Sequence, residues 1–455
     1  MSSANQALGV AGNGRSQVEA IWRAGIDAVS PRGLVAREMR ENPELAEQIR
    51  DCHRVLLLGA GKAARAMVEG ALDALPSGKE LCGWVHVVDG QEGEPIPGCR
   101  LVGVRPVAAN YPTERGLSGS ERQMELAANA REGDLGLVLL SGGASAMMPL
   151  PVQGISLAEK LQVTKLLHAS GASITEMNTV RKQLSRIKGG GLARAWSGSR
   201  RQPSLWTLAI SDVMGDGADV IGSGPTVPDQ GSAQGAIECL ERYGLKDAVP
   251  PSVIHVLEAR RQEQKKEKLL AEYPWSRFVL AGNNRKAVKA ARLQAEALGW
   301  RVFDFGSSWE LDAGNLAKLL EELSRNIVRD EVGGGPPLCV LMGGESQLKL
   351  CENPGAGGRN QHVALLLIGQ MELPWLAKST WLLGGTDGED GPTDAAGGFA
   401  DIEALFQLRK QGIDWADALR KFSSYEALRK AGALFKTGQT GTNVADLWVG
   451  LIGAP

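Results

Sequence analysis

The chain has 455 residues and a formal net charge of −2, with 50 Lys and Arg residues against 52 Asp and Glu residues. This balance provides no basic field for nucleic acid, and no apolar run reaches the roughly 20 residues of a membrane span, so we expect a cytoplasmic protein. Six cysteines without a C-x-x-C pair and five histidines without an H-x-x-x-H pair argue against disulfide frameworks, His-based zinc sites and Ser-His-Asp hydrolases.

Apolar runs alternate with helical patterns through the first half of the chain. Strands are predicted at residues 55–58, 84–88, 135–140 and 205–210. Helices are predicted at residues 16–37, 43–51, 121–130, 157–169 and 174–187, with an irregular stretch at 90–119. Asn42 is the expected N-cap of the second helix, because Pro43 then occupies its first position. The alternation favours parallel α/β layers.

The first predicted strand leads into a glycine-rich turn, VLLLGAGKAARAM, at residues 55–67. Gly59, Gly61 and Ala64 match the G-x-G-x-x-A pattern of dinucleotide-binding turns. Lys62 departs from that pattern because it places a cation at the positive end of a helix, which is favourable mainly where an anion binds. We therefore interpret the turn as a site for a carboxylate or a phosphate rather than for a dinucleotide.

The third predicted strand is followed by SGGASAMM. Gly142 and Gly143 in this loop offer backbone amides to an anion, and Ser145 adds a hydroxyl donor. A plain tight turn explains the same residues equally well. Further along the chain, Lys188 precedes three glycines and is the expected anion contact of a basic helical segment.

The loop after the fourth predicted strand, SDVMGDGADVIGSGPTVPD, combines carboxylates with hydroxyls and glycines. Ser211, Asp212 and Asp216 provide oxygen ligands of the kind that Mg²⁺ prefers, although Asp and Ser side chains also cap helices. Gly224 and Thr226 follow in a segment that is bracketed by prolines.

The second half of the chain repeats the arrangement of strands that end in polar loops. MGGES places Gly343, Gly344 and Glu345 after an apolar strand, and GGRNQ opens a helix with Arg359 and Asn360. Arg359 would combine a fork of donors with a helix N-terminus, which favours a bound anion. The alternative is a surface arginine beside a turn.

Two later loops are acidic or rich in threonine. GTDGEDGPTDAAG contains Thr386 and Asp387, and we interpret it as a metal or polyol site, with a solvated turn as the alternative. TGQTGTN contains Thr440 and Asn443, which suit hydrogen bonds to a phosphate or nucleotide and, nearly as well, turns and caps.

A charged run, EARRQEQKKEK at residues 258–268, is expected to be a solvated helix that leads into a linker. The predicted domains are therefore residues 1–265 and 275–455. Together they contain two cationic helix starts, several amide-rich loops and two acidic loops, which is the inventory that phosphoryl transfer needs. No P-loop motif occurs, and the protein-kinase motifs H-R-D and D-F-G do not appear as a set.

With these residues in view, the chain resembles the glycerate 2-kinase family, whose C-terminal half is called the MOFRL domain. The motifs that carry the resemblance are GAGKAA (59–64), LSGGASA (140–146), NTVRKQLSRIKGG (178–190), SDVMGDGADVIGSGPTVPD (211–229), GGES (343–346), GGRNQ (357–361), GTDGEDGPTDAAGG (385–398) and TGQTGTNVADL (437–447). Any one of these motifs is weak evidence, but all of them in the same order are specific.

The resemblance implies transfer of the γ-phosphate of ATP, with Mg²⁺, to the 2-hydroxyl of D-glycerate. It also implies two α/β domains with mostly parallel, Rossmann-like sheets and an active site in the cleft between the domains. Lys62 and Arg359 would hold the carboxylate or the transferring phosphate, and Asp212 and Asp387 would bind metal or orient the hydroxyl; these four are the expected catalytic residues. The expected metal ligands are Asp212, Asp216 and Asp387. The expected nucleotide contacts are Gly142, Gly143, Ser145, Lys188, Ser211, Gly224, Thr226, Gly343, Gly344, Glu345, Asn360, Thr386, Thr440 and Asn443.

One stretch departs from the family pattern. Where the family carries a G-H-P-x-P-D loop, this chain reads AANYPTERG at residues 108–116, without the His and the Asp. The acceptor is therefore open, and a kinase for another small hydroxy acid is one alternative. An NAD(P)H-dependent hydroxypyruvate reductase is another, but its ribose contact would be Asp89, which lies farther beyond Gly61 than the expected ~20 residues. A small-molecule substrate is the expected partner, and a homodimer is left open.

Overall fold

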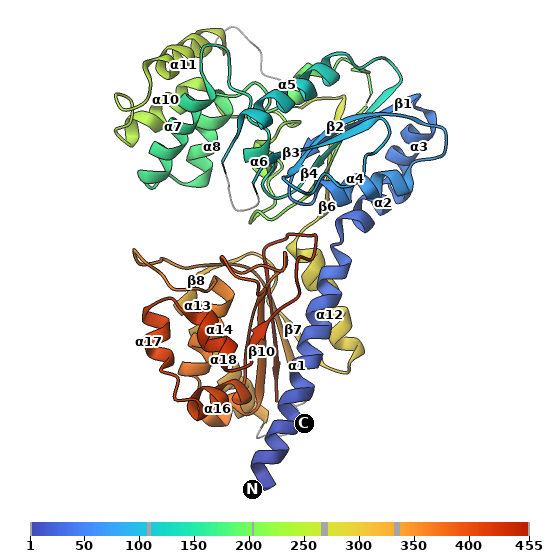
Figure 1. The fold of residues 1–455 in the computed structure, drawn as a ribbon. Helices are drawn as coiled ribbons and strands as arrows, with labels where there is room; N and C mark the ends of the chain where they lie inside the picture. Colours follow the sequence, from blue (N-terminus) through green and yellow to red (C-terminus); the bar gives the residue numbers. More distant parts are fainter. Residues whose placement is uncertain (1, 107–110, 203, 265–271, 332–336, 454–455) are drawn as a thin grey trace. The chain divides into compact units, whose positions relative to one another are not determined.

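The computed structural model describes residues 2–106, 111–202, 204–264, 272–331 and 337–453. The chain forms two compact units (Figure 1): an N-terminal unit, Pro31–Ala281, and a C-terminal unit that combines Met1–Ser30 with Gly282–Pro455. This division differs from the expected domains because the first helix belongs with the C-terminal half of the chain. Each unit has its own sheet and its own apolar core, which confirms an α/β fold of two domains.

The N-terminal unit contains a six-stranded sheet in the order β3-β2-β1-β4-β5-β6. Its strands are β1 (Arg54–Ala60), β2 (Glu80–Val88), β3 (Cys99–Arg105), β4 (Asp134–Leu140), β5 (Leu205–Ile210) and β6 (Ser276–Gly282). The four pairings from β3 through β5 are parallel, and the strand order reverses between β1 and β4. In open α/β sheets such a reversal marks where ligands bind, just beyond the carboxyl ends of the strands.

Burial on both faces explains the apolar composition of the central strands, since every residue of β4 and β5 is buried. Leu56 and Leu58 on one face of β1 share a core with α5 (Glu114–Ala128), whereas α4 (Ala64–Ala74) follows β1 and packs against β1, β2 and β4. The stretch expected to be irregular contains β3 and the start of α5. Its apolar run is short and flanked by Arg100 and Arg105, so no clear strand pattern marks it in the sequence.

A group of helices, here called the helical layer, flanks this sheet and shares its own apolar core (Figure 1). Its members are α7 (Leu157–Ala169), α8 (Ile174–Gln183), α10 (Ala233–Arg242) and α11 (Pro251–Gln264). α7 and α8 each begin with a capping box, in which Ser156 and Ser173 accept hydrogen bonds from the amides of Glu159 and Glu176. The remaining helices of the unit are α2 (Pro31–Glu41), α3 (Pro43–Asp51), α6 (Ala144–Met147) and α9 (Gly191–Ala195), with a 3₁₀ turn at Ile221–Ser223.

The sheet of the C-terminal unit has the order β12-β11-β10-β13-β9-β7, and β8 also pairs with β9. Its strands are β7 (Arg301–Asp304), β8 (Trp309–Asp312), β9 (Leu338–Gln347), β10 (Ser379–Gly385), β11 (Gly397–Ala400), β12 (Leu434–Phe435) and β13 (Asp446–Ile452). Only β7 and β8 run parallel to β9, and the other pairings are antiparallel. This sheet therefore differs from the expected, mostly parallel one, because β10 and β11 are joined by a loop without the crossover helix that parallel neighbours need.

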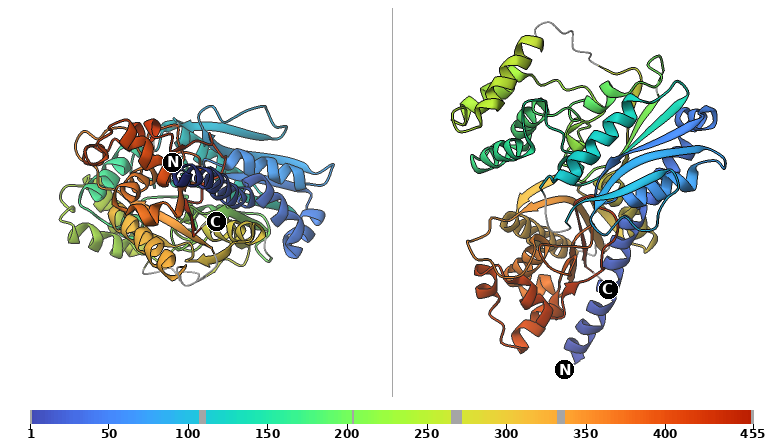
Figure 2. Two further views of the ribbon diagram at one scale, coloured as in Figure 1. Left: turned by 90° about the horizontal axis from the view of Figure 1, so that it is seen from below. Right: turned by 45° about the horizontal axis from the view of Figure 1, so that its top comes forward.

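Helices cover both faces of this second sheet. α1 (Ser2–Ala28) and α12 (Asn284–Ala297) pack against one another, and α1 also contacts β10 and β13 (Figures 1 and 2). α13 (Ala313–Glu331) and α14 (Arg359–Gln370) pack together, and α14 contacts β10 and β11. The smaller helices are α15 (Leu373–Leu376), α16 (Ile402–Lys410), α17 (Trp415–Arg420) and α18 (Ser424–Lys430).

The helix predicted at residues 16–37 is two helices, because Pro31 starts a new one and α1 ends at Ala28. Asn42 caps the next helix as expected, since its side-chain oxygen accepts a hydrogen bond from the amide of Leu45 at 3.2 Å. α1 carries Trp22, whose buried ring meets Phe435 edge-on with centroids 5.0 Å apart. This contact binds the first helix to the C-terminal sheet.

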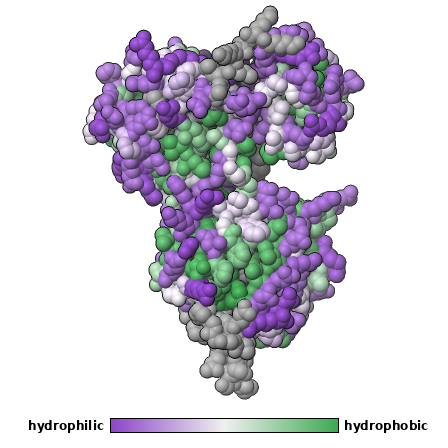
Figure 3. All heavy atoms as spheres, turned by 180° about the vertical axis from the view of Figure 1, so that it is seen from behind, coloured by the Kyte–Doolittle hydropathy of each residue, from purple (hydrophilic) through white to green (hydrophobic). Residues whose placement is uncertain are grey.

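Hydrophilic residues cover much of the face drawn in Figure 3, and apolar residues form smaller areas among them. Within the part of the chain that the structure describes, no helix is both long and apolar enough to cross a bilayer.

Candidate functional site

The carboxyl ends of β1 and β4 are joined directly at the point where the strand order reverses. The Lys62 amide donates to the Gly142 carbonyl at 2.9 Å, and the Ala63 amide donates to Ser141 Oγ at 3.0 Å. Gly59 and Gly61 have φ of +125° and +148°, and a Cβ on either would overlap β4 or Ser141. The G-x-G pattern is therefore required by the close approach of two strands and needs no dinucleotide to explain it.

Two basic side chains border Gly143 in the loop after β4. A Cβ built on Gly143 would lie 3.7 Å from the Arg105 guanidinium and 3.8 Å from Cγ of Lys62. Lys62 is exposed, whereas Arg105 is 3% exposed and burial lowers its pKa. The amides of Gly142 and Gly143 donate to no atom of the described residues. This loop therefore offers backbone donors beside two cations, which is an environment for an anion.

Ser145 lies in α6, directly after this loop, and connects it to α8 of the helical layer. Its Oγ accepts hydrogen bonds from Arg181 at 2.6 Å and from Lys188 Nζ at 2.9 Å, and it lies 2.9 Å from Ser223 Oγ. Lys188 is 2% exposed and also donates to the Ser145 carbonyl at 2.7 Å. Burial, with Arg181 nearby, holds the Lys188 pKa well below its ordinary value. The predicted anion contact thus braces the loop from behind.

The loop after β5 contains buried polar groups with hydrogen-bond partners inside the protein and also partly exposed carboxylates. The Ser211 hydroxyl is buried in a turn with Val213, and Thr226 Oγ1 lies 2.5 Å from Thr207 Oγ1 in the core. Gly224 has φ +60° and shapes the same segment. These three residues therefore shape the loop, and in this conformation the buried side chains of Ser211 and Thr226 offer no surface to a nucleotide.

The carboxylates of this loop are more accessible. Asp212 and Asp216 are partly exposed, and Asp216 adopts φ +53°, a conformation that Asp tolerates better than most residues. Among the described residues, no group of three or more His, Cys, Asp or Glu side chains is placed to hold a metal ion. A metal here would therefore need ligands from elsewhere, such as phosphate oxygens and water.

In the C-terminal unit, α14 begins at Arg359 as predicted, but its N-terminus is already occupied. Asp390 accepts hydrogen bonds from the Asn360 amide at 3.0 Å and from the Gln361 amide at 2.8 Å. Burial raises the Asp390 pKa to about 6, although these amides and Arg359 favour its charged form. Asn360 is itself buried, with its Oδ1 accepting from Trp448. An internal carboxylate thus takes the place of the external anion that we expected at these amides.

The Arg359 side chain is held between two carboxylates. It donates to Glu345 and lies 3.7 Å from Asp446, which starts β13 and is 2% exposed. Burial raises the Asp446 pKa to about 7 even though Arg359 opposes that shift. The guanidinium itself remains partly exposed, so Glu345 and Asp446 orient it while leaving donors for a ligand.

Gly343 and Gly344 do not form the loop that we expected, because β9 continues through them to Gln347. A Cβ on Gly343 would overlap Asn284 Oδ1, and a Cβ on Gly344 would overlap the Trp309 carbonyl. These glycines are therefore required for the close packing of α12 and β8 against β9. Glu345 lies beyond them in the same strand.

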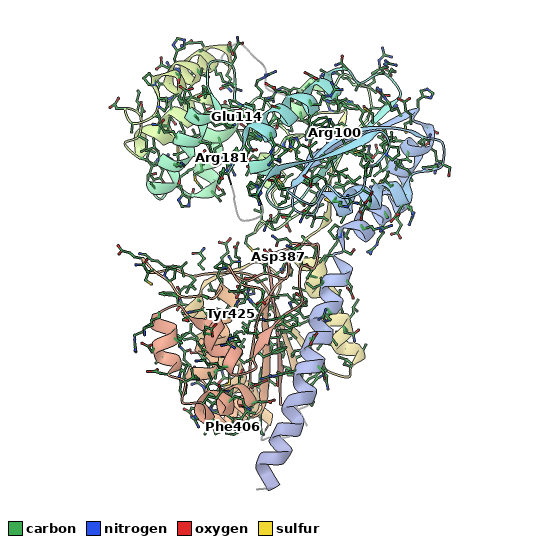
Figure 4. The ribbon with its side chains drawn as sticks, viewed as in Figure 1. Arg100, Glu114, Arg181, Asp387, Phe406 and Tyr425 are labelled. Atoms are coloured by element: carbon green, nitrogen blue, oxygen red, sulfur yellow. The ribbon has the colours of Figure 1, made fainter. Side chains whose placement is uncertain are left out.

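The loops after β10 and before β13 are interlocked. Thr386 is fully buried, and its hydroxyl donates to the Ala445 carbonyl at 2.6 Å. The Thr440 hydroxyl donates to the Thr386 carbonyl at 2.6 Å, and Asn443 Oδ1 accepts from the Ala445 amide at 3.1 Å. Asp387, labelled in Figure 4, is partly exposed, and one of its oxygens accepts from the Glu389 amide at 3.1 Å. The threonines and Asn443 thus hold Asp387 at the surface of its loop.

Sequence reasoning missed Arg105 and Asp446. Arg105 ends a short strand that we read as irregular, and a lone arginine directly after the run LVGV was the available signal. Asp446 starts the last strand, and nothing in ADLWVGLIG shows that this carboxylate reaches Arg359.

Comparisons with known proteins agree with this architecture. Residues 17–258 match the family described as a domain of unknown function, DUF4147, and residues 338–446 match the MOFRL family. D-glycerate 2-kinase of Thermotoga maritima is 34% identical over 95% of this chain and 97% of its own length. Glycerate 2-kinase of Pyrococcus horikoshii is 33% identical over 85% of this chain and 88% of its own length. The crystal structure of glycerate kinase from Thermotoga maritima superposes with a TM-score of 0.82 at 33% identity, covering 96% of this chain and 100% of that chain.

Proposed function

The chain belongs to the glycerate kinase family, and from this premise we propose that it transfers the γ-phosphate of ATP to the 2-hydroxyl of D-glycerate, giving 2-phosphoglycerate and ADP. The observation that carries the proposal is the junction between β1 and β4, where Lys62 and Arg105 border a loop whose glycine amides donate to no acceptor within the described part of the chain. Phosphoryl transfer depends on such positioned cations and donors more than on covalent chemistry by the protein.

Lys62 and Arg359 bind the negative charge of the reactants in this proposal. Lys62 is an exposed point charge at a strand end, and Arg359 presents a guanidinium oriented by Glu345 and Asp446. Either can hold the carboxylate of D-glycerate or stabilise the transferring phosphoryl group. Gly142 and Gly143 donate backbone hydrogen bonds to phosphate oxygens, and Ser145 adds a hydroxyl.

Mg²⁺ fits the carboxylates that the described loops expose. An ion that travels with a nucleotide needs only one or two protein carboxylates, because phosphate oxygens and water complete its shell. Asp212 and Asp216 on one loop and Asp387 on another meet that requirement, since all three are partly exposed. An Mg²⁺ ion held by these carboxylates would neutralise part of the phosphate charge of the nucleotide. Asp212 and Asp387 are also suited to orient the 2-hydroxyl and accept its proton.

The buried members of the predicted set act indirectly. Ser211, Thr226, Asn360 and Thr386 have their polar side-chain atoms engaged inside the protein, so they position the loops that carry the charged groups. Thr440, Asn443 and Gly224 shape the same loops, and Lys188 braces Ser145. Gly343 and Gly344 allow β9 to pack, which places Glu345 beside Arg359.

The hydroxypyruvate reductase alternative gains no support, because the G-x-G glycines are explained by strand packing alone. The alternative that the chain phosphorylates another small hydroxy acid arises from the stretch AANYPTERG. Residues 108–110 of this stretch lie outside the described part of the chain. The described part of the stretch contains Thr113, which caps α5 through the Gly116 amide. D-Glycerate remains the proposed acceptor on the strength of the relatives.

The test is ADP release by the purified chain with ATP, Mg²⁺ and D-glycerate, compared with L-glycerate, with D-lactate and with no acceptor. We expect D-glycerate to give the highest kcat/KM and EDTA to abolish turnover. Higher kcat/KM with D-lactate would replace the proposed acceptor. Oxidation of NADH by hydroxypyruvate without ADP release in the first assay would refute the kinase.

A further inference from the structure

Four basic side chains lie in or next to the helical layer, and two of them donate hydrogen bonds to Ser145, which follows the loop after β4. Lys160 lies on α7, Arg181 and Lys182 lie at the C-terminal end of α8, and Lys188 follows α8. Figure 4 labels Arg181 at that end of α8. Lys160, Lys182 and Lys188 are 7%, 7% and 2% exposed. Such burial of several ammonium groups in one region is costly unless negative charge compensates them.

Carboxylates pair with only one of these four basic side chains among the described residues. Lys182 Nζ pairs with Asp219 at 3.0 Å and with Asp229 at 3.5 Å. Among the described residues, no carboxylate lies within ion-pair distance of Lys160, Arg181 or Lys188. The structure therefore pairs none of these three buried or half-buried basic groups with a carboxylate of the described residues.

Lys160 is the clearest anomaly of the group. Its buried Nζ has no hydrogen-bond partner among the described residues. Burial and the adjacent Arg181 lower its pKa to about 7, and its own charge contributes to the lowered pKa of Lys188. The Lys160 amine is therefore buried near two other basic groups, and an apolar side chain of similar length would avoid the cost of burying it.

Ser145 marks the accessible side of this group. Its partly exposed hydroxyl receives hydrogen bonds from both Arg181 and Lys188, so two cationic donors converge on one oxygen. An oxyanion beside Ser145 would engage the same donors and supply the charge that the protein lacks. Arg181 suits a phosphate because its fork can donate two parallel hydrogen bonds.

We propose that Lys160, Arg181 and Lys188 form, against Ser145, a binding site for the tetrahedral oxyanion of a phosphoryl group. The phosphoryl group comes from one of two ligands, the nucleotide or 2-phosphoglycerate, and in naming these ligands the inference rests on the proposed function. Lys160 provides long-range charge from within the helical layer, Lys188 braces the loop, and Arg181 makes the direct contact.

Calorimetric titration of the full chain tests the proposal with ADP and, separately, with 2-phosphoglycerate. Lys160→Met is expected to weaken at least one of the two ligands about tenfold, and the ligand that is weakened identifies the source of the phosphate. Lys160→Arg is expected to retain most of the affinity because it keeps the charge. Lys165→Met is the matched control, since Lys165 is exposed on the same helix, and it is expected to bind both ligands as the wild type does.

A second readout does not depend on the folding of a variant. At pH 8 the binding of the phosphorylated ligand is expected to draw a proton onto the buried lysines of the unmodified protein, because an adjacent anion raises their pKa. Titrations in two buffers of different ionisation enthalpy measure this uptake. Unchanged affinity of Lys160→Met for both ligands, or binding without proton uptake, would overturn the proposal. A chain that binds ADP in this way but releases none from ATP and D-glycerate would instead refute the proposed function.

Discussion

Lys62 and Arg359 stand at the starts of glycine-led helices, yet their surroundings differ. Lys62 is exposed beside a loop whose Gly142 and Gly143 amides donate to none of the described residues, whereas Arg359 contacts Glu345 and faces the buried Asp446. Removing the exposed Lys62 side chain is therefore expected to disturb the fold less than removing Arg359, which leaves Asp446 without its counter-charge. A loss of activity is easier to assign to chemistry at Lys62 than at Arg359.

Lys62→Ala is expected to lower kcat/KM for phosphorylation of D-glycerate by about a hundredfold or more, the usual effect of removing one group that stabilises developing charge. Its midpoint of thermal unfolding is expected to stay within about 2 °C of the wild type, because exposed substitutions change stability little. Steady-state kinetics and a thermal melt of the same sample measure both quantities. Lys165→Ala serves as the exposed control, and a fully active Lys62→Ala enzyme would remove Lys62 from the mechanism.

Asp446 makes stability depend on pH. Its folded-state pKa is about 7, raised by burial from an ordinary 3.8. At pH values well below 4 the Asp446 carboxyl is protonated in both the folded and the unfolded state. Between pH 4 and pH 7 it ionises in the unfolded chain but not in the folded one, so the folded state loses stability. Above pH 7 it is ionised in both states, and the loss is complete. Asp446→Asn cannot ionise. Its stability relative to the wild type is therefore expected to rise between pH 4.5 and pH 8, by on the order of a few kcal/mol.

Urea unfolding of both proteins at the two pH values measures this difference directly. Asp390 is present in both proteins, so its own raised pKa cancels to first order. A stability difference that is the same at pH 4.5 and at pH 8 would show that Asp446 is ionised throughout, as a strong pair with Arg359 would make it.

At the scale of elements, the sequence correctly predicted those helix starts and strands that depend on neighbouring residues. The Asn42 cap and the apolar strands β1, β4 and β5 follow from neighbouring residues, and α14 starts at Arg359 as expected. β3 was missed, and Gly343 and Gly344 were misread as loop residues. Both errors concern partners that are distant in sequence, since the overlaps that forbid a Cβ on those glycines come from α12 and β8.

The packing of α1 against the C-terminal sheet could not be predicted from periodicity. Trp22 is 1% exposed against Phe435, and Arg15 pairs with Asp401 at 2.5 Å. Trp22→Ala is expected to destabilise the C-terminal unit by about 3–5 kcal/mol, because it leaves a large cavity. Arg23→Ala is the control on the same helix. Arg23 is exposed and pairs with the partly exposed Glu19 one turn away, so the cost is expected to stay below about 0.5 kcal/mol. Urea unfolding measures the free energy of unfolding of both variants and of the wild type. A Trp22→Ala variant as stable as Arg23→Ala would contradict the observed packing.

At the scale of the whole molecule, the sequence predicted the α/β class and two domains, and the structure confirms both. It did not predict that the N-terminal segment Met1–Ser30 belongs to the same unit as Gly282–Pro455. Tertiary packing, which local sequence patterns do not reveal, determines this assignment. Nor could the sequence show which charged groups in the predicted loops are buried. Motifs in the sequence pointed to Lys62, Asp212 and Arg359 as candidates, whereas Arg105 and Asp446, and the division of the charged groups into exposed and buried ones, needed the structure.

The central claim is that this chain phosphorylates the 2-hydroxyl of D-glycerate. The most direct test mixes the purified protein with ATP, Mg²⁺ and D-glycerate in the presence of enolase and in the absence of phosphoglycerate mutase. We predict that phosphoenolpyruvate appears, because enolase acts on 2-phosphoglycerate and not on the 3-phosphate. ADP without phosphoenolpyruvate would contradict the position of transfer, and no ADP at all would contradict the claim itself.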